Sequence, residues 1–262
     1  MGKISLQMFT MRERTKTIDE LKETVRRLSE IGFDTLQYTI PDSFDAREVK
    51  RIFDGFGIKN DSVFCPHLKI EERMAEVLSQ CDLFETKYVR CDSITAGLTE
   101  CAGGYKAFAH YLNEAAKPFA KYGIKLLYHF HAFEFKRFGN KTGIDIILSE
   151  TDPGYIQIIP DTHWIHSGGK NVVEFLEKYK DRYDYIHAKD YGIGVNRDIL
   201  ESRPVEICPV GDGNLEWGPI IDFCKKKGVA SYAIEQDCCY GRDEFDSVKS
   251  SYDFLKRMGV ED

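Results

Sequence analysis

Short, mostly apolar runs alternate along the chain with longer segments whose apolar residues recur every three or four positions. The short runs predict buried strands and the longer segments predict amphipathic helices, as where Leu21, Val25 and Leu28 fall on one side of residues 17–31. The predicted strands are residues 4–8, 33–38, 57–64, 87–91, 123–130, 155–160, 183–188 and 229–235. The predicted helices are residues 17–31, 44–53, 71–83, 105–121, 144–148, 172–179, 216–227 and 244–257.

This alternation of strand and helix favours a parallel sheet. Because the 262 residues are close to the ~250 of a typical closed barrel, we expect one α/β domain, a (β/α)8 TIM barrel over residues 1–262. Glycines that precede four strands should each end a helix in the left-handed conformation: Gly32, Gly57, Gly123 and Gly228. The long connection at residues 190–214 should overhang the catalytic face.

Acid and imidazole side chains close four of the apolar runs: Glu134, Asp161, His187 and Glu235. In a parallel barrel the carboxyl ends of all strands meet at one face, so these side chains should converge. Carboxylates with an imidazole suit a divalent ion, which predicts a metal-dependent enzyme. Two alternatives stay open, because Asp161 could instead cap the next helix and His187 could be a hydrogen-bonded core residue.

Residues 128–135 hold the densest group of polar and aromatic side chains. On a strand His129 and His131 share one face, and Glu134 lies just past the strand end; the alternative is a structural histidine pair in a core. His163 and Trp164 suggest a pocket wall, because an aromatic surface packs well on a sugar ring.

Other polar residues near the predicted strand ends are candidates for substrate binding. Lys189 could polarise a substrate oxygen or simply be solvated. Burying the charge of Glu235 without a cation nearby would cost free energy, which supports a role for Glu235 as a metal ligand. No arginine cluster lies near the strand ends, so we expect an unphosphorylated substrate. The substrate-binding set is Gln7, Tyr38, His67, His163, Trp164 and Lys189.

Composition and charge limit the classes of molecule that this protein is expected to bind. The net charge of −7 disfavours nucleic acid, and no 18-residue apolar run or signal peptide is present, so we expect no membrane association. The eight cysteines include no C-x-x-C pair and predict free thiols in the cytoplasm. Ser-His-Asp, dinucleotide-binding, P-loop and H-E-x-x-H patterns are absent from the sequence. A small carbohydrate is the expected partner, and a homo-oligomer is left open.

The chain resembles the xylose isomerase-like TIM barrel superfamily, in its sugar phosphate isomerase/epimerase branch. The resemblance covers nearly the whole chain and is carried by residues 5–13, 128–135, 161–164, 187–190, 210–217 and 234–237. It implies Mn²⁺ or Mg²⁺, with Zn²⁺ or Co²⁺ as alternatives, held by Glu, Asp, His and Glu. Asp161, His187 and Glu235 match the last three positions. His129 occupies the first, so either His129 or Glu134 is the ligand; we prefer Glu134, because carboxylates suit hard cations.

The resemblance also implies an isomerase or epimerase that moves a proton in a sugar or keto-sugar through a metal-stabilised enediolate. The candidate bases are Glu134, Glu235, His129 and His131. One alternative is a lyase or dehydratase acting on a 3-keto-glycoside or inosose. Another is a non-catalytic carbohydrate-binding barrel, for which the departure at His129 is the best argument. An apurinic endonuclease is disfavoured by the negative charge.

Overall fold

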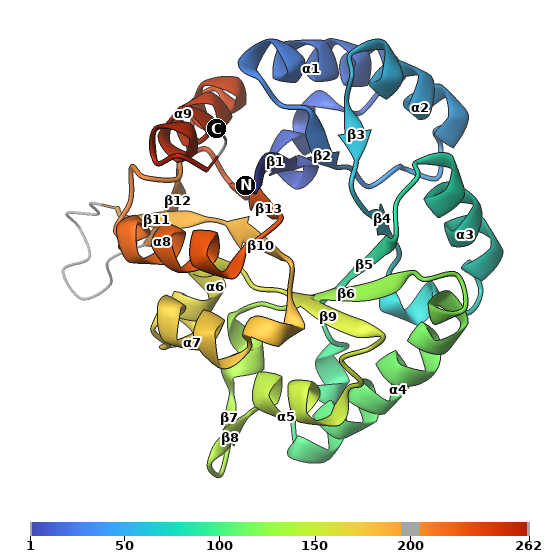
Figure 1. Cartoon of the computed structure of the whole chain (residues 1–262), viewed down its shortest axis with the longest axis vertical. Helices are drawn as coiled ribbons and strands as arrows, with labels where there is room; N and C mark the ends of the chain where they lie inside the picture. Colours follow the sequence, from blue (N-terminus) through green and yellow to red (C-terminus); the bar gives the residue numbers. More distant parts are fainter. Residues whose placement is uncertain (1, 195–204, 261–262) are drawn as a thin grey trace. The chain divides into compact units, whose positions relative to one another are not determined.

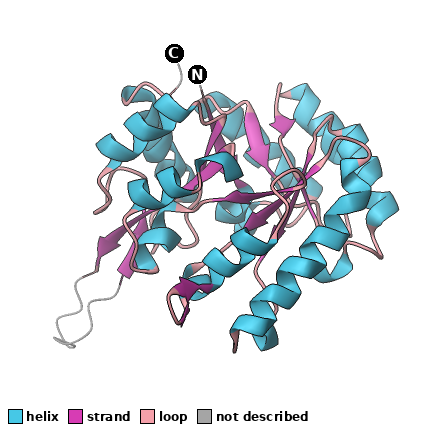
Figure 2. Cartoon of the chain, turned by 60° about the horizontal axis from the view of Figure 1, so that its bottom comes forward, coloured by secondary structure: helices cyan, strands magenta, loops and turns pink. Residues whose placement is uncertain are grey.

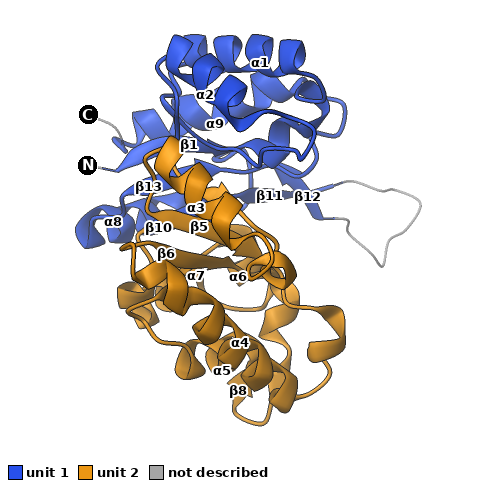
Figure 3. Cartoon of the chain, turned by 90° about the vertical axis from the view of Figure 1, so that its right-hand side faces the viewer, with its two compact units in different colours: residues 1–60, 185–262 blue, residues 61–184 orange. Residues whose placement is uncertain are grey.

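The computed structural model describes residues 2–194 and 205–260. The chain divides into two compact units, Met1–Asn60 with Tyr185–Asp262 (unit 1) and Asp61–Asp184 (unit 2), coloured separately in Figure 3. In both, short strands of a parallel sheet alternate along the chain with helices; Figure 2 draws strands in magenta and helices in cyan. The predicted alternation of strand and helix is therefore present in each unit.

Unit 1 is built on a five-stranded parallel sheet in the order β10-β13-β1-β2-β3 (Figure 1). Strands β2 and β13 are buried along their whole length, as is usual for parallel strands covered by helices. Its elements are β1 (Lys3–Gln7), η1 (Met8–Arg14), α1 (Ile18–Ile31), β2 (Thr35–Gln37), α2 (Ala46–Gly55), β3 (Lys59–Asn60), β10 (Tyr185–Ala188), β11 (Asp190–Ile193), β12 (Val205–Cys208), α8 (Trp217–Lys227), β13 (Ser231–Ile234) and α9 (Glu244–Arg257).

Unit 2 contains a four-stranded parallel sheet in the order β4-β5-β6-β9. The fully buried β9 and the long helix α4 supply much of its apolar core. Its elements are β4 (Val63–Phe64), η2 (His67–Lys69), α3 (Met74–Leu83), β5 (Tyr88–Asp92), η3 (Ala96–Leu98), α4 (Ala102–Ala120), β6 (Lys125–His129), η4 (Ala132–Phe135), β7 (Arg137–Phe138), β8 (Lys141–Thr142), α5 (Gly143–Glu150), β9 (Ile156–Ile159), α6 (Thr162–Ser167), α7 (Val172–Lys178) and η5 (Lys180–Arg182).

Local signals in the sequence set many of these boundaries. Thr17 caps α1 as predicted, and with Glu20 it completes a capping box that satisfies backbone N–H groups at both ends of the turn. The four glycines predicted to end helices all have positive φ, from 68° at Gly123 to 123° at Gly32. Only Gly228 is a left-handed C-cap, at the end of α8, while Gly32 caps α1 outside the left-handed region. Helices α2 and α4 are capped by Phe56 and Lys121, just before Gly57 and Gly123, so this prediction is confirmed in part.

Several features of the described residues depart from the predicted elements, among them the antiparallel hairpin of β7 and β8, where no strand was predicted. The third strand, residues 57–64, is divided into β3, which pairs with β2, and β4, which pairs with β5. The connection at residues 190–214 contains an antiparallel hairpin of β11 and β12, while residues 195–204 of that prediction lie outside the described residues. The short helix α6, which begins after Pro160 and Asp161, lies outside the predicted helices.

Within residues 2–194 and 205–260, no helix combines the length and apolarity needed to cross a bilayer. All eight cysteines carry free thiols, as the sequence predicted.

Candidate metal centre

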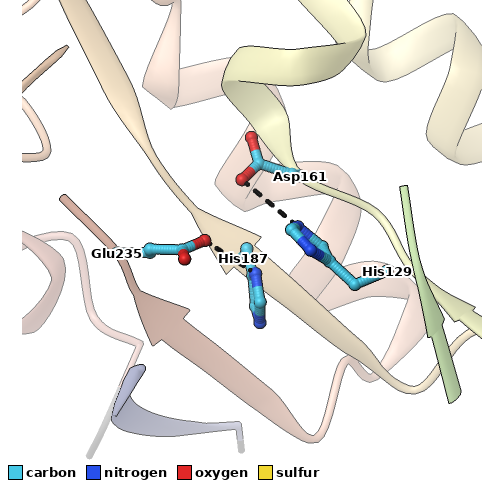
Figure 4. A group of neighbouring side chains, drawn as sticks. All are labelled: His129, Asp161, His187 and Glu235. Carbon is cyan, nitrogen blue, oxygen red and sulfur yellow. Dashed lines mark ion pairs between the residues drawn. The ribbon is translucent and has the colours of Figure 1, made fainter. Parts of the chain in front are cut away.

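In unit 2, His129 and Asp161 meet at the carboxyl ends of neighbouring strands. His129 is the last residue of β6, and Asp161 follows β9, which pairs with β6. The Nε2 atom of His129 lies 3.7 Å from Oδ2 of Asp161 (Figure 4). The Oδ1 atom of Asp161 also accepts a hydrogen bond from Trp164 N at 2.9 Å, so this carboxylate caps α6 while its other oxygen faces the imidazole.

In unit 1, His187 and Glu235 form the corresponding pair. His187 belongs to β10, Glu235 follows β13, and these two strands are neighbours in the sheet. Nδ1 of His187 lies 2.9 Å from Oε2 of Glu235, and the other ring nitrogen, Nε2, lies 2.9 Å from Oε1 of Gln37 (Figure 4). Both His187 and Glu235 are buried, so the imidazole is held in one orientation by contacts on both sides.

Lys189 is a buried cation rather than a solvated one, with 1% of its surface exposed. Its Nζ lies 3.0 Å from Oε2 of Glu235 and 3.0 Å from Oδ2 of Asp237. A buried ammonium needs such compensation, because desolvation of an unpaired charge is costly. Unit 1 therefore places an ammonium group and a carboxylate side by side at the ends of two adjacent strands.

Both carboxylate oxygens of Glu134 accept hydrogen bonds from neighbouring residues. Its Oε1 accepts from the hydroxyl of Tyr128, and its Oε2 accepts from the backbone N–H of His131 at 2.9 Å. Burial raises the pKa of the Glu134 carboxyl to about 7, although these hydrogen bonds oppose the rise. The contacts do not support our preference for Glu134 over His129 as a metal ligand. His129, which faces Asp161, is the better placed of the two.

The remaining aromatic candidates of unit 2 form a connected wall. The ring of His131 stacks nearly parallel on Phe133, with centroids 5.5 Å apart, and is tilted against Trp164 at 5.4 Å. Trp164 in turn contacts His163. Phe133 is 45% exposed, so part of this wall is open to a ligand.

Three of the residues predicted to contact the substrate form hydrogen bonds within their own units. Oε1 of Gln7 accepts from the backbone of the helical turn η1, Tyr38 N donates to Oδ1 of Asn60 at 2.8 Å, and Nε2 of His67 lies 2.9 Å from the hydroxyl of Thr95. Burial raises the pKa of Tyr38 to about 12. All three residues lie at or just after strand ends, and their contact with a substrate stays a prediction.

Asp190 is a buried residue that holds the loop before α8 in place, a role that the sequence did not reveal. Its carboxylate accepts hydrogen bonds from the loop that precedes α8, and the sequence Val-Gly-Asp-Gly-Asn at residues 210–214 supplies two of the five donors. The groups that donate to it are the backbone N–H of Tyr191 (2.8 Å), Gly211 (3.0 Å), Gly213 (3.3 Å) and Leu215 (3.2 Å), and Nε1 of Trp217 (2.6 Å).

A pocket of about 510 Å³ lies in unit 1 beside the segments that follow β1 and β13. Arg12, Arg14 and Arg242 line it, so an arginine group does exist here, contrary to the sequence-based expectation. Arg14 pairs with Glu244 at 2.9 Å and Arg242 with Asp212 at 3.0 Å. Because these carboxylates neutralise two of the three cations, an unphosphorylated substrate stays our prediction.

A TIM-barrel scaffold carries catalytic groups at the carboxyl ends of its strands, and both units place their acid and imidazole groups there. The chain belongs to the xylose isomerase-like TIM barrel family, whose sequence model matches residues 25–258. This confirms the predicted family and the fold class.

Two curated relatives are inosose dehydratases. The protein from Geobacillus kaustophilus (strain HTA426) is 38% identical over 90 residues, which are 34% of this chain and 27% of that protein. The protein from Clostridium botulinum (strain Alaska E43 / Type E3) is 31% identical over 144 residues, 51% of this chain and 48% of that protein. The matched segments thus span less than half the length of these relatives.

Solved structures share the fold over nearly the whole chain. A sugar phosphate isomerase/epimerase from Parabacteroides distasonis ATCC 8503 has a TM-score of 0.80 at 21% identity, covering 99% of this chain and 96% of its own. A probable 3-DHS dehydratase from Bacillus anthracis has a TM-score of 0.75 at 14% identity, covering 97% and 98%. The IOLI protein with a binding zinc atom has a TM-score of 0.66 at 14% identity, covering 98% and 97%.

Proposed function

We propose that this chain is a divalent-metal-dependent lyase that removes water from a keto-sugar or a keto-cyclitol. The observation that carries the proposal is the buried carboxylate of Glu235 beside the buried ammonium of Lys189, 3.0 Å apart. The names of the curated relatives, inosose dehydratases, support the same reaction class.

The proposed ion would be held by His129, Asp161, His187 and Glu235. Two imidazoles and two carboxylates fit a divalent cation, and the nitrogen ligands favour Zn²⁺, Mn²⁺ or Co²⁺ over Mg²⁺. The zinc of the IOLI structure supports a metal in this fold. When bound, the ion supplies positive charge that polarises a substrate carbonyl and makes the neighbouring C–H more acidic.

The residues of unit 1 supply the proton transfers. Glu235 takes the proton from the carbon next to the carbonyl, and the C–H electrons form a new C=C bond. The C–O bond of the β-hydroxyl breaks, and Lys189 donates the proton that lets the oxygen leave as water. The steps balance without an oxidant or reductant. The wall of His131, Phe133 and Trp164 offers a surface for the apolar face of the ring.

The second candidate is an isomerase or epimerase on the same residues, favoured by the fold shared with the Parabacteroides distasonis protein. Isomerisation needs only one base that returns the proton to the neighbouring carbon, a role open to Glu235. A donor placed next to the base, as Lys189 is, adds most to a reaction that expels a hydroxyl group. We therefore place elimination first. We also propose a cytoplasmic location, supported by the eight free thiols.

Product analysis in deuterated water tests the proposal. The protein loaded with Mn²⁺ is incubated with a panel of inososes and keto-sugars, and masses are recorded over time. Loss of one water from the substrate supports the lyase; deuterium incorporation without loss of mass supports the isomerase or epimerase. Sugar binding without turnover, unchanged in Asp161→Ala and His187→Ala, would instead favour a non-catalytic barrel.

A further inference from the structure

The imidazole of His129 lies between two carboxylates of unit 2. Asp92, the last residue of β5, is paired in the sheet with His129, the last residue of β6. Nδ1 of His129 lies 3.9 Å from Oδ1 of Asp92, while Nε2 lies 3.7 Å from Oδ2 of Asp161. The two ring nitrogens thus face different acids, and the register of the sheet fixes this arrangement.

Asp92 is itself held in place by a buried arginine. Its Oδ2 accepts from Nη1 of Arg90 at 2.9 Å, and the Arg90 guanidinium, with 1% of its side chain exposed, lies 5.0 Å from the ring centroid of Phe64. The other oxygen, Oδ1, is buried and has no hydrogen-bond partner among the described residues. A buried carboxylate oxygen without a donor is costly, so Oδ1 is ready to accept a hydrogen bond from His129.

We propose that Asp92 is a positioning residue that accepts the Nδ1–H of His129 and so presents Nε2, without a proton, to the metal ion. This inference rests on the proposed function. The 3.7 Å between Nε2 and the Asp161 oxygen is too long for a hydrogen bond, but it suits two ligands that each lie about 2.1 Å from one cation. A histidine that binds a metal through one nitrogen usually donates its other N–H to a carboxylate or carbonyl.

The imidazole of His187 has a similar arrangement of contacts. His187 directs Nδ1 to Glu235, a proposed ligand, and Nε2 to Oε1 of Gln37, an acceptor outside the proposed ligand set. In the proposal, Asp92 accepts a hydrogen bond from the ring nitrogen of His129 that does not face the ion, as Gln37 can for His187. Asp92 directly follows the strand predicted at residues 87–91, so the rule that selected the other strand-end acids could have found it.

Zinc affinity tests the inference in the full-length protein. We expect Asp92→Ala to weaken Zn²⁺ binding by about 10–100-fold, the usual loss when such a partner is removed. Asp92→Asn should lose less, because the amide oxygen still accepts the N–H. The matched control is Asp152→Ala, an exposed aspartate of the same unit that should leave the affinity unchanged. Competition with a chelating indicator measures each dissociation constant, and thermal unfolding of the metal-free variants checks that they fold.

Nitrogen-15 NMR of the zinc-loaded protein gives a second, independent readout. A slowly exchanging Nδ1–H on His129 is expected in the wild type, shifted in Asp92→Asn and lost to fast exchange in Asp92→Ala. Zinc bound with unchanged affinity and an unchanged ring signal in both variants would overturn the role of Asp92 and leave the proposed function standing. Failure of the wild-type protein to bind zinc, manganese or cobalt would overturn both.

Discussion

Glu235 is buried and contacts both Lys189 and His187. Replacing it with glutamine removes the charge of the side chain but keeps its shape. We expect Glu235→Gln to reduce turnover at least ~100-fold, because lost acid–base chemistry alone accounts for about that factor. The fold should stay intact, since glutamine fills the same space. Steady-state kinetics on the substrate found in the product screen measure the loss, and circular dichroism checks the fold.

Glu216 offers a matched control for that substitution, because it is an exposed glutamate of the same unit and makes no side-chain cap bond to α8. Glu216→Gln should leave turnover unchanged. Near-normal turnover in Glu235→Gln would remove Glu235 from the mechanism, whatever the control shows.

The choice between His129 and Glu134 shows where sequence reasoning stopped at the scale of single residues. The strand ends could be located from the apolar runs, and that was enough to select both residues. Which of them faces Asp161 depends on the path of the chain after β6, where the turn η4 directs Glu134 back to Tyr128 and His131. No pattern in residues 128–135 predicted the tyrosine contact, because it closes only once the turn has formed.

The loop before α8 depends on the absence of one side chain. A Cβ on Gly213 would lie 2.4 Å from Oδ1 of Asp190 and 2.5 Å from the carbonyl oxygen of Tyr191, closer than packed atoms approach. We expect Gly213→Ala to lower the free energy of unfolding by about 1–3 kcal/mol, the usual cost of forcing atoms into a filled space. Gly218→Ala is the control, since nothing lies within 4 Å of a Cβ there. Equal stability of the two variants in urea unfolding would contradict the clash.

Helices α5 and α7 of unit 2 are joined through Asp145. Burial would raise the pKa of its carboxyl, but hydrogen bonds from Lys178, Thr142 and Tyr179 outweigh burial and hold the pKa well below its usual range. The folded state therefore favours the ionised form, so its contribution to stability is complete above the unfolded pKa of about 3.9 and is lost as the pH falls through the folded value.

Asp145→Asn should consequently destabilise the protein at pH 7 and by less at pH 3. Urea unfolding at several pH values measures the difference between wild type and variant. Asp181→Asn, an exposed aspartate of the same unit, should show no such pH dependence. A difference that stays constant between pH 7 and pH 3 would exclude the ionised carboxylate as the cause.

At the scale of elements, periodicity was sufficient wherever an element buries one continuous face. The apolar spacing in residues 17–31 and the cap at Thr17 locate α1 closely. The division of the third strand into β3 and β4 was not visible, because Asp61 and Ser62 interrupt the pairing without changing the apolar pattern. The hairpin of β11 and β12 was missed because antiparallel pairing within a long connection depends on register rather than on a local pattern.

At the scale of the whole molecule, metal should stabilise the folded protein, because the proposed ligands come from strand ends far apart in the sequence. A ligand at 100 times its dissociation constant adds about 2.7 kcal/mol to the free energy of unfolding if it binds only the folded state. We therefore expect chelation to lower the melting temperature and Mn²⁺ or Zn²⁺ to restore it. Differential scanning calorimetry measures both changes.

Hydrogen exchange can show whether the four proposed ligands bind a single ion. In the wild type, metal should slow the exchange of β10 in unit 1, which carries His187. Asp161→Ala removes a donor from unit 2 alone, yet it should abolish that protection, because an ion bound by too few ligands is held weakly. If metal still protected β10 in Asp161→Ala to the same extent, His187 and Glu235 would be binding it on their own. The four-residue centre would then have to be replaced by a site confined to unit 1.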